Sequence, residues 1–188
     1  MYLEKVKNEC LEWLKAIVIG GIFVIAIRAF IFSPISVEGA SMMPTYEDGD
    51  RIIVNKISKA INDYERFDVV VFKTAESTHY IKRIIGLPGD HIAYKDDQLY
   101  INGKKYEEPY LDQYKLQLTG DLELTYDFTL EEKTNLAQVP EGHYFVLGDN
   151  RRESNDSRNP SVGYIDENKI LGKVSLTYYP LDHISLVE

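Results

Sequence analysis

The hydrophobic pattern divides the chain into one long apolar segment near the N-terminus and a series of short apolar runs in the remainder. The segment 16–32 carries a single charged residue, Arg28. Its length is at the short limit for a helix that rises about 1.5 Å per residue across a bilayer core of about 30 Å. Ser33 and Pro34 end this helix, because the residue before a proline avoids helical geometry. We therefore predict a single transmembrane helix, an anchor, at 13–32.

The placement of basic residues predicts the orientation of this anchor. Lysines precede the apolar segment, whereas no Lys or Arg occurs between Arg28 and Arg51. The positive-inside rule then places the tail 1–12 in the cytoplasm and the body 33–188 on the extracytoplasmic face of the cell membrane. Two other interpretations stay open. One is a cleaved signal peptide, for which residues 37–39 offer a poor cleavage site, and the other is a buried core helix.

The body shows short runs rich in Val and Ile that are separated by turn residues, a pattern typical of β-strands. The expected strands are Arg51–Asn55, Asp68–Phe72, Tyr80–Ile85, His91–Lys95, Gln98–Asn102, His143–Leu147 and Gly172–Tyr179. Asp96-Asp97 is interpreted as a hairpin turn. The stretch 107–138 is more polar and less regular, and we interpret it as an insertion or cap-like segment. Within it, a capping box that begins at Thr129 predicts a short helix. The body is therefore expected to be mainly β.

Composition excludes several classes of function. The formal net charge of −9 argues against a nucleic-acid partner, because phosphate binding needs clusters of Lys and Arg. Cys10 is the only cysteine, which excludes an intrachain disulfide. The four histidines show no metal-ligand spacing, so we do not expect a structural metal.

Residues 39–45 form the first segment that is able to carry chemistry. A small, flexible Gly-Ala pair precedes Ser41, and a proline follows closely. This arrangement suits a backbone that holds a hydroxyl in a fixed, open position. The patterns G-x-S-x-G and S-x-x-K both fail, because Met43 and Pro44 occupy their last positions. Taken alone, Ser41 is more often an ordinary loop serine than a nucleophile.

The second segment places two cations on opposite faces of a predicted strand. Tyr80 and Lys82 share one face, while Ile81 and Arg83 share the other. If one face is buried, one cation points inward. Burial lowers the pKa of a lysine, and a neutral amine then accepts the proton of a serine hydroxyl. Arginine stays protonated and cannot do this. The alternative is an edge-strand lysine that reaches water.

The third segment, residues 148–158, is polar throughout after Gly148 and directly follows the apolar run 144–147. Such density indicates a hydrogen-bonded loop packed against a site. A solvated surface loop is the alternative from this segment alone. A calcium loop fits poorly, because Arg151 and Arg152 lie among the positions that would hold ligands.

Together these segments resemble the signature boxes of type I signal peptidases, in the form found in Gram-positive bacteria. The boxes occur in the order of that family: Ser41-Met42-Met43-Pro44-Thr45, Gly49-Asp50-Arg51 with Val54-Asn55-Lys56, Tyr80-Ile81-Lys82-Arg83 with Gly86-Leu87-Pro88-Gly89-Asp90, and Gly148–Arg158. The resemblance implies an all-β catalytic domain on a membrane anchor. It also implies a serine endopeptidase that removes the signal peptides of exported preproteins after small-x-small sites, without metal or cofactor. Its partners would be those signal peptides and the lipid bilayer.

The resemblance also implies roles for individual residues. Ser41 matches the nucleophile that forms an acyl-enzyme, and Lys82 matches the general base. Ser154 matches the serine whose hydroxyl orients the lysine amine. Asp156 and Arg158 match a charged pair that supports the site.

The implied oxyanion hole uses the backbone N–H of Ser41. Gram-negative members add a serine hydroxyl two residues earlier, where this chain has Gly39. The second donor is therefore either the N–H of Gly39 or a water molecule. The stretch 158–163 also departs from the family, because it is longer than the usual link from this arginine to the next glycine.

Two rival functions remain on the residues alone. A Ser/Lys self-cleaving repressor or mutagenesis protein shares this type of fold, but such proteins act beside DNA, and the anchor and the acidic body speak against that. A tethered β-domain that only binds partners is the other rival. The presence of both Ser41 and Lys82 speaks against it.

Overall fold

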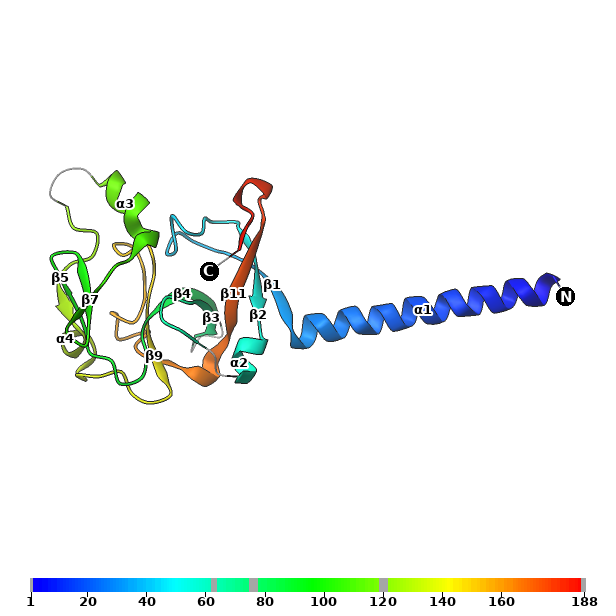
Figure 1. The fold of residues 1–188 in the computed structure, drawn as a ribbon, viewed down its shortest axis with the longest axis horizontal. Helices are drawn as coiled ribbons and strands as arrows, with labels where there is room; N and C mark the ends of the chain where they lie inside the picture. The colour runs from blue at the N-terminus through cyan, green and yellow to red at the C-terminus, as the bar shows by residue number, and fades with distance from the viewer. Residues whose placement is uncertain (1, 62–63, 75–77, 119–121, 187–188) are drawn as a thin grey trace.

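The computed structural model describes residues 2–61, 64–74, 78–118 and 122–186. A long N-terminal helix, α1 (Tyr2–Phe30), extends away from a body built mainly of strands (Figure 1). Over the described residues no helix, α1 included, combines the length and the apolarity that crossing a membrane requires. The spanning anchor expected at 13–32 is therefore not confirmed.

The strands of the body form two antiparallel sheets. The large sheet contains, in spatial order, β1 (Phe32–Ser36), β2 (Arg51–Asn55), β11 (Ile170–Tyr179), β3 (Val69–Lys73), β4 (His79–Gly86), β9 (His143–Leu147) and β10 (Ile165–Asp166), with β12 (Ser185–Leu186) beside β11. The small sheet has the order β7 (Lys104–Tyr106), β6 (Gln98–Ile101), β5 (Ile92–Lys95) and β8 (Phe128–Thr129). The prediction of a mainly β body is confirmed.

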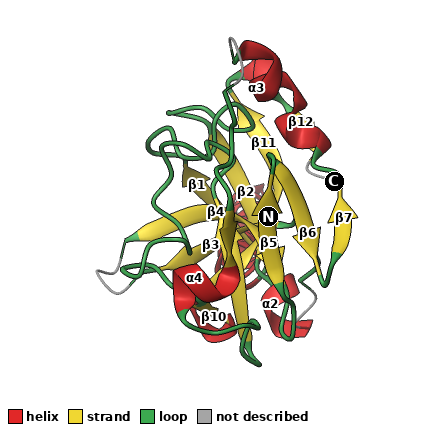
Figure 2. Cartoon of the chain, turned by 90° about the vertical axis from the view of Figure 1, so that its left-hand side faces the viewer, coloured by secondary structure: helices red, strands yellow, loops and turns green. Residues whose placement is uncertain are grey.

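The helical elements of the body are short and lie around the strands (Figure 2). They are α2 (Ile57–Ile61), η1 (Pro109–Leu111), α3 (Asp112–Gln117), α4 (Leu130–Thr134), η2 (Glu167–Lys169) and η3 (Leu181–His183). The capping box predicted at Thr129 is confirmed, since its hydroxyl accepts from Glu132 N–H and the Glu132 carboxylate accepts from Thr129 N–H. These reciprocal bonds satisfy two donors that a helix start leaves without partners.

The expected strands all form, with some ends shifted by one or two residues. The predicted hairpin turn is confirmed: Asp96 and Asp97 have φ of 52° and 55°, the left-handed values that a tight two-residue turn needs. The stretch 107–138 supplies strand β8 and buried side chains, among them Leu111 and Phe128. The described parts of this stretch are thus built into the small sheet and its core.

The packing of the core fixes the turn that carries Ser41. Met42, directly after Ser41, is 1% exposed and packs with Val54 and Val71 of the large sheet. At the opposite end, Phe145 of β9 and Tyr94 of β5 belong to one apolar cluster that joins the two sheets. Apolar burial stabilises by roughly 25 cal/mol per Å². The Ser41 turn is therefore held by the same core as the strands beside it.

Candidate active site

Ser41 lies in the turn between β1 and β2. The two ends of this turn are joined, because Val37 N–H donates to Asp50 O at 2.8 Å and Gly49 N–H donates to Val37 O at 3.0 Å. Ser41 itself is half-buried while Met42 points into the core. Because the side chain of Met42 is buried in the core, the backbone at Ser41 is held in place while the serine itself stays partly exposed.

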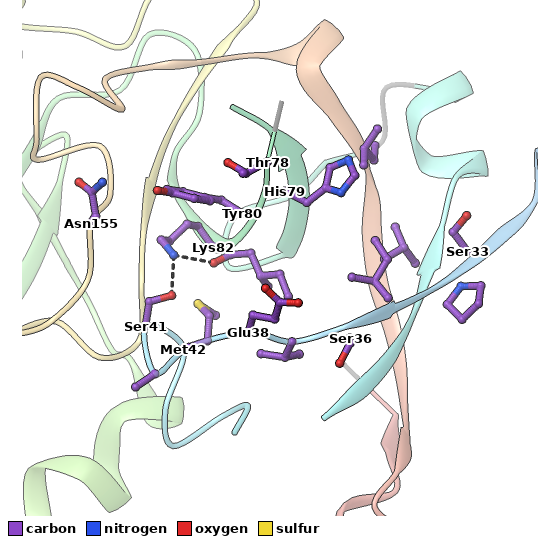
Figure 3. Close-up of a pocket in the computed structure, with 18 of the residues that line it drawn as sticks. Ser33, Ser36, Glu38, Ser41, Met42, Thr78, His79, Tyr80, Lys82 and Asn155 are labelled. Carbon is purple, nitrogen blue, oxygen red and sulfur yellow. Dashed lines mark hydrogen bonds between the residues drawn. The ribbon is translucent and has the colours of Figure 1, made fainter. Parts of the chain in front are cut away.

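Lys82 meets Ser41 from strand β4. Its Nζ donates to Ser41 Oγ at 2.7 Å and to Ile81 O at 2.9 Å (Figure 3). The lysine is 3% exposed, and its Nζ lies 5.2 Å from the centre of the Tyr80 ring. The structure thus brings together two residues that are far apart in the sequence, and it places an amine within proton-transfer distance of a hydroxyl.

Burial changes the acidity of this amine. Desolvation lowers the pKa of Lys82 from 10.5 to about 8, and the carboxylates of Asp156 and Asp149 oppose this shift. A neutral amine is therefore accessible near physiological pH. In that form Lys82 is able to accept the proton of Ser41.

The other cation of β4, Arg83, is buried too. Its Nε and Nη2 donate to the two carboxylate oxygens of Asp149 at 2.9 and 2.6 Å, and Asp149 also accepts from the hydroxyl of Thr45 at 2.6 Å. If one face of β4 were buried, the alternation along the strand would turn one of its two cations inward. Both are buried, because the inner part of this strand is covered on both faces. Asp149 thereby links β4 to the Ser41 turn.

The loop that follows β9 packs directly on the nucleophile turn. A side chain at Gly148 would collide with the carbonyl oxygen of Ser41 and with the hydroxyl of Ser154, so only glycine fits there. Ser154 Oγ is buried and has no hydrogen-bond partner in the described structure. The hydrogen bond to the lysine amine that the resemblance implied is therefore not formed in this structure.

Asp156 and Arg158 form the expected pair. Arg158 donates from Nε and Nη2 to the two oxygens of Asp156, at 2.8 and 2.7 Å. The fully buried Asp156 also accepts from the backbone N–H of Gly148 at 3.1 Å. The pair lies under the same loop, and the charge of Asp156 raises the pKa of Lys82 against the effect of burial.

The two N–H groups considered for an oxyanion hole differ. Across the described residues, the N–H of Ser41 has no hydrogen-bond acceptor. The N–H of Gly39 donates to Asp48 Oδ1 at 2.8 Å. Gly39 is therefore engaged elsewhere and does not offer a second donor in this structure, whereas Ser41 N–H is available.

A cleft of about 1020 Å³ opens beside Ser41 and Lys82. The stretch 33–42 lines one side and 78–82 lines the other, and Figure 3 shows Ser41 and Lys82 at one end with Ser33 at the other. Strand β9 pairs with β4 only from Arg83 onward. The backbone edge of the preceding β4 residues is thus open to the cleft.

Over the described ranges, no cluster of three or more His, Cys, Asp or Glu side chains is placed to hold a metal ion.

Comparison with known proteins decides the family. The family model described as signal peptidase, peptidase S26, matches residues 10–179. The chain belongs to this signal peptidase family. The resemblance to signal peptidases seen in the sequence boxes is thereby confirmed.

Signal peptidases from several bacteria are similar over most of their length. The chain is 54% identical to signal peptidase I of Bacillus caldolyticus, over 84% of this chain and 85% of that protein. It is 42% identical to signal peptidase IB of Staphylococcus aureus, over 93% and 92%. A crystal structure of a signal peptidase I from Enterococcus faecalis matches with a TM-score of 0.57 and 42% identity, covering 60% of this chain and 97% of that one.

Sequence reasoning without the structure missed several residues of this signal peptidase site. Asp149 and Asn150 stand in the polar loop, but nothing in their spacing shows that they contact the Ser41 turn. Arg83 was recognised as a cation and not as the partner of Asp149. A usable signal was the dense run of hydrogen-bonding side chains immediately after a buried strand.

Proposed function

We propose that this chain is a membrane-attached signal peptidase I, in which Ser41 is the nucleophile and Lys82 the general base. It cuts the signal peptides of exported preproteins after small-x-small sites. The observation that carries the proposal is the 2.7 Å contact between Lys82 Nζ and Ser41 Oγ, made by an amine that burial keeps largely neutral above about pH 8. Family membership supports the same reaction.

The reaction is acyl transfer. Neutral Lys82 takes the proton of Ser41 as Oγ attacks the scissile carbonyl. The N–H of Ser41 donates a hydrogen bond to the carbonyl oxygen as negative charge develops on that oxygen. The amide C–N bond then breaks, and Lys82 gives its proton to the leaving amine. The acyl group remains esterified to Ser41 until a water, deprotonated by Lys82, attacks its carbonyl carbon. The C–Oγ bond then breaks, Lys82 returns the proton to Ser41 Oγ, and the carboxylate product leaves.

The cleft suits an extended peptide. The open edge of β4 next to Lys82 and the stretch that follows β1 offer backbone groups on both sides. A substrate strand added there alternates its side chains, so every second residue points into the protein. Met42 and Ile81 are among the residues that line the cleft. The preference for small side chains at alternate positions is carried over from the resemblance to the family.

The loop residues support the dyad in this proposal. Asp156 forms an ion pair with Arg158. Its carboxylate stabilises the protonated form of Lys82 and so raises the pKa of the amine, which burial lowers. The buried hydroxyl of Ser154 lies against Gly148, which in turn packs on the carbonyl of Ser41. We assign Ser154 the role of orienting the lysine amine in the substrate complex.

Cleavage of a preprotein with an Ala-x-Ala site by the full chain in detergent tests the proposal. The wild type is expected to cut after the second alanine, and Ser41→Ala to lose at least about 10³-fold in rate, since the nucleophile is gone. Ser161→Ala, at an exposed loop serine, is the matched control and should cut normally. Wild-type rates in Ser41→Ala would sink the assignment. Failure of the wild type to cut any such substrate would favour a partner-binding domain.

We further propose that α1 attaches the chain to the membrane, with the tail 1–12 in the cytoplasm, the attachment at 13–32 and the catalytic body 33–188 outside. The large apolar side chains of α1 are 52–72% exposed at Trp13, Leu14, Ile17, Val18, Ile19, Ile22, Phe23, Val24 and Ile25. An apolar surface of this extent needs a covering phase, and lipid fits it because α1 has no charged residue between Lys15 and Arg28.

Extraction of membranes from producing cells tests this attachment. The wild-type chain is expected to stay in the membrane pellet after washing at high pH. A variant with Ile19→Asp and Phe23→Asp should move to the supernatant, because two charges on this surface oppose entry into lipid. In detergent the variant should cleave like the wild type, since neither residue touches the cleft. A wild-type chain washed off at high pH would contradict the proposal.

A further inference from the structure

The peptide unit between Ala40 and Ser41 connects the loop after β9 to the oxyanion site. A trans peptide is planar, and its C=O and N–H point in opposite directions. The carbonyl of Ala40 and the N–H of Ser41 belong to this one plane. A group that donates a hydrogen bond to the Ala40 oxygen therefore also fixes the direction of the Ser41 N–H, which points away from that group.

Two donors hold the Ala40 oxygen. The N–H of Met43 donates to it at 3.1 Å within the turn, and the side-chain Nδ2 of Asn150 donates to it at 3.1 Å from the loop after β9. The backbone N–H of Asn150 also donates to Ser41 O at 3.1 Å. One residue thus binds the carbonyls on both sides of the nucleophile, and it does so from a position that is 4% exposed.

A second residue fixes the direction of the Asn150 amide. Tyr114, on α3, donates from Oη to Asn150 Oδ1 at 2.8 Å. A flipped amide would place Oδ1 against Ala40 O, and two acceptors repel each other. With the amide oriented by Tyr114, Nδ2 faces the Ala40 oxygen. A hydrogen bond to the carbonyl also polarises the N–H of the same peptide.

We infer that Asn150, oriented by Tyr114, is a positioning residue that fixes the Ala40–Ser41 peptide so that the Ser41 N–H stabilises the oxyanion of the transition state. The inference rests on the proposed function and extends it. It also assigns a role to α3, part of the stretch 107–138 that the sequence left without one. The hydroxyl of Tyr114 links that stretch to the nucleophile turn through the side chain of Asn150.

Kinetics of two variants in the preprotein assay test this inference with the full chain. Asn150→Ala keeps the backbone bond to Ser41 O and removes the amide, so kcat should fall about 10²-fold while KM stays within about twofold, because an oxyanion donor acts only in the transition state. Tyr114→Phe removes one hydroxyl and should lower kcat about tenfold with KM again unchanged. Tyr126→Phe is the matched control: its exposed hydroxyl contacts Arg152, and kcat should not change.

The pH profile separates positioning of the oxyanion site from damage to the dyad. Neither variant touches Lys82, so the midpoint of kcat/KM against pH should stay at the wild-type value. A fall in kcat that comes with a shifted midpoint, or a rise in KM at constant kcat, would overturn the inference. Unchanged kcat in both variants would overturn it as well. If Asn150→Ala does not fold, Tyr114→Phe decides alone. An active Ser41→Ala in the same assay would instead mark failure of the proposed function.

Discussion

Replacing Lys82 with arginine is expected to lower kcat/KM for a preprotein by at least about 10³-fold. Arginine keeps the positive charge and the length of the side chain, but it stays protonated at every pH at which the protein is folded. It therefore cannot accept the proton of Ser41, although it is still able to donate hydrogen bonds. The substitution thus distinguishes a role of Lys82 as proton acceptor from a role as a positive charge alone. Initial rates over a range of substrate concentrations measure the change in kcat/KM.

The pH profile of the wild type complements this substitution. Lys82 acts only when neutral, and burial lowers its pKa to about 8. Below that pH, kcat/KM should fall about tenfold per pH unit, and above it the value should level off. Lys59→Arg is the matched control, because Lys59 is exposed and donates to Asn168 O away from the cleft. A Lys82→Arg chain that retains a tenth of the activity would show that Lys82 is not the base.

Replacing Glu108 with leucine is expected to destabilise the folded chain by about 3–5 kcal/mol, because it leaves the charge of Arg151 buried and uncompensated. The Arg151 side chain is 0% exposed, and its Nη2 lies 2.5 Å from the Glu108 carboxylate. The remaining partners of Arg151 are the neutral oxygens of Tyr94, Thr125, Tyr110 and Gly148. None of these carries the opposite charge.

Thermal unfolding followed by circular dichroism measures this effect, and a loss of that size corresponds to a decrease in Tm of roughly 6–20 °C. The neighbouring Glu107→Ala is the matched control. Glu107 is 80% exposed in its ion pair with Lys105, so its loss should change stability by less than about 1 kcal/mol. Adding Arg151→Met to Glu108→Leu should restore part of the loss, because the buried charge is then removed. A Tm for Glu108→Leu equal to that of Glu107→Ala would contradict the argument.

The sequence predicted the strands better than the contacts between them. Runs of Val and Ile marked the strands expected at 51–55, 68–72 and 80–85, because a buried strand selects for such residues locally. The Thr129 capping box was readable within four residues. The approach of Lys82 to Ser41 is a product of sheet pairing. The spacing of Ser41 and Lys82 in the sequence does not predict this contact, and only the resemblance to a family indicated that the two residues act together.

Other misses have the same physical origin. Alternation along β4 predicted one inward cation, and the structure buries both, because strand periodicity does not reveal whether one face or two is covered. The hydrogen bond from Tyr114 to Asn150 joins a helix and a loop with no shared pattern. Of the two candidates for the second oxyanion donor, the N–H of Gly39 is engaged in this structure, because Asp48, in the same turn, accepts from it.

Strand β1 has a consequence for where cleavage takes place. Helix α1 ends at Phe30, and β1 then runs from Phe32 to Ser36, paired residue by residue with β2. A paired strand has a fixed rise of about 3.3 Å per residue, unlike a coil that stretches and contracts. The five residues of β1 therefore act as a ruler about 17 Å long between the end of α1 and the turn that bears Ser41. With α1 attached to the membrane as proposed, this fixed length sets the height above the membrane surface at which a substrate is cut.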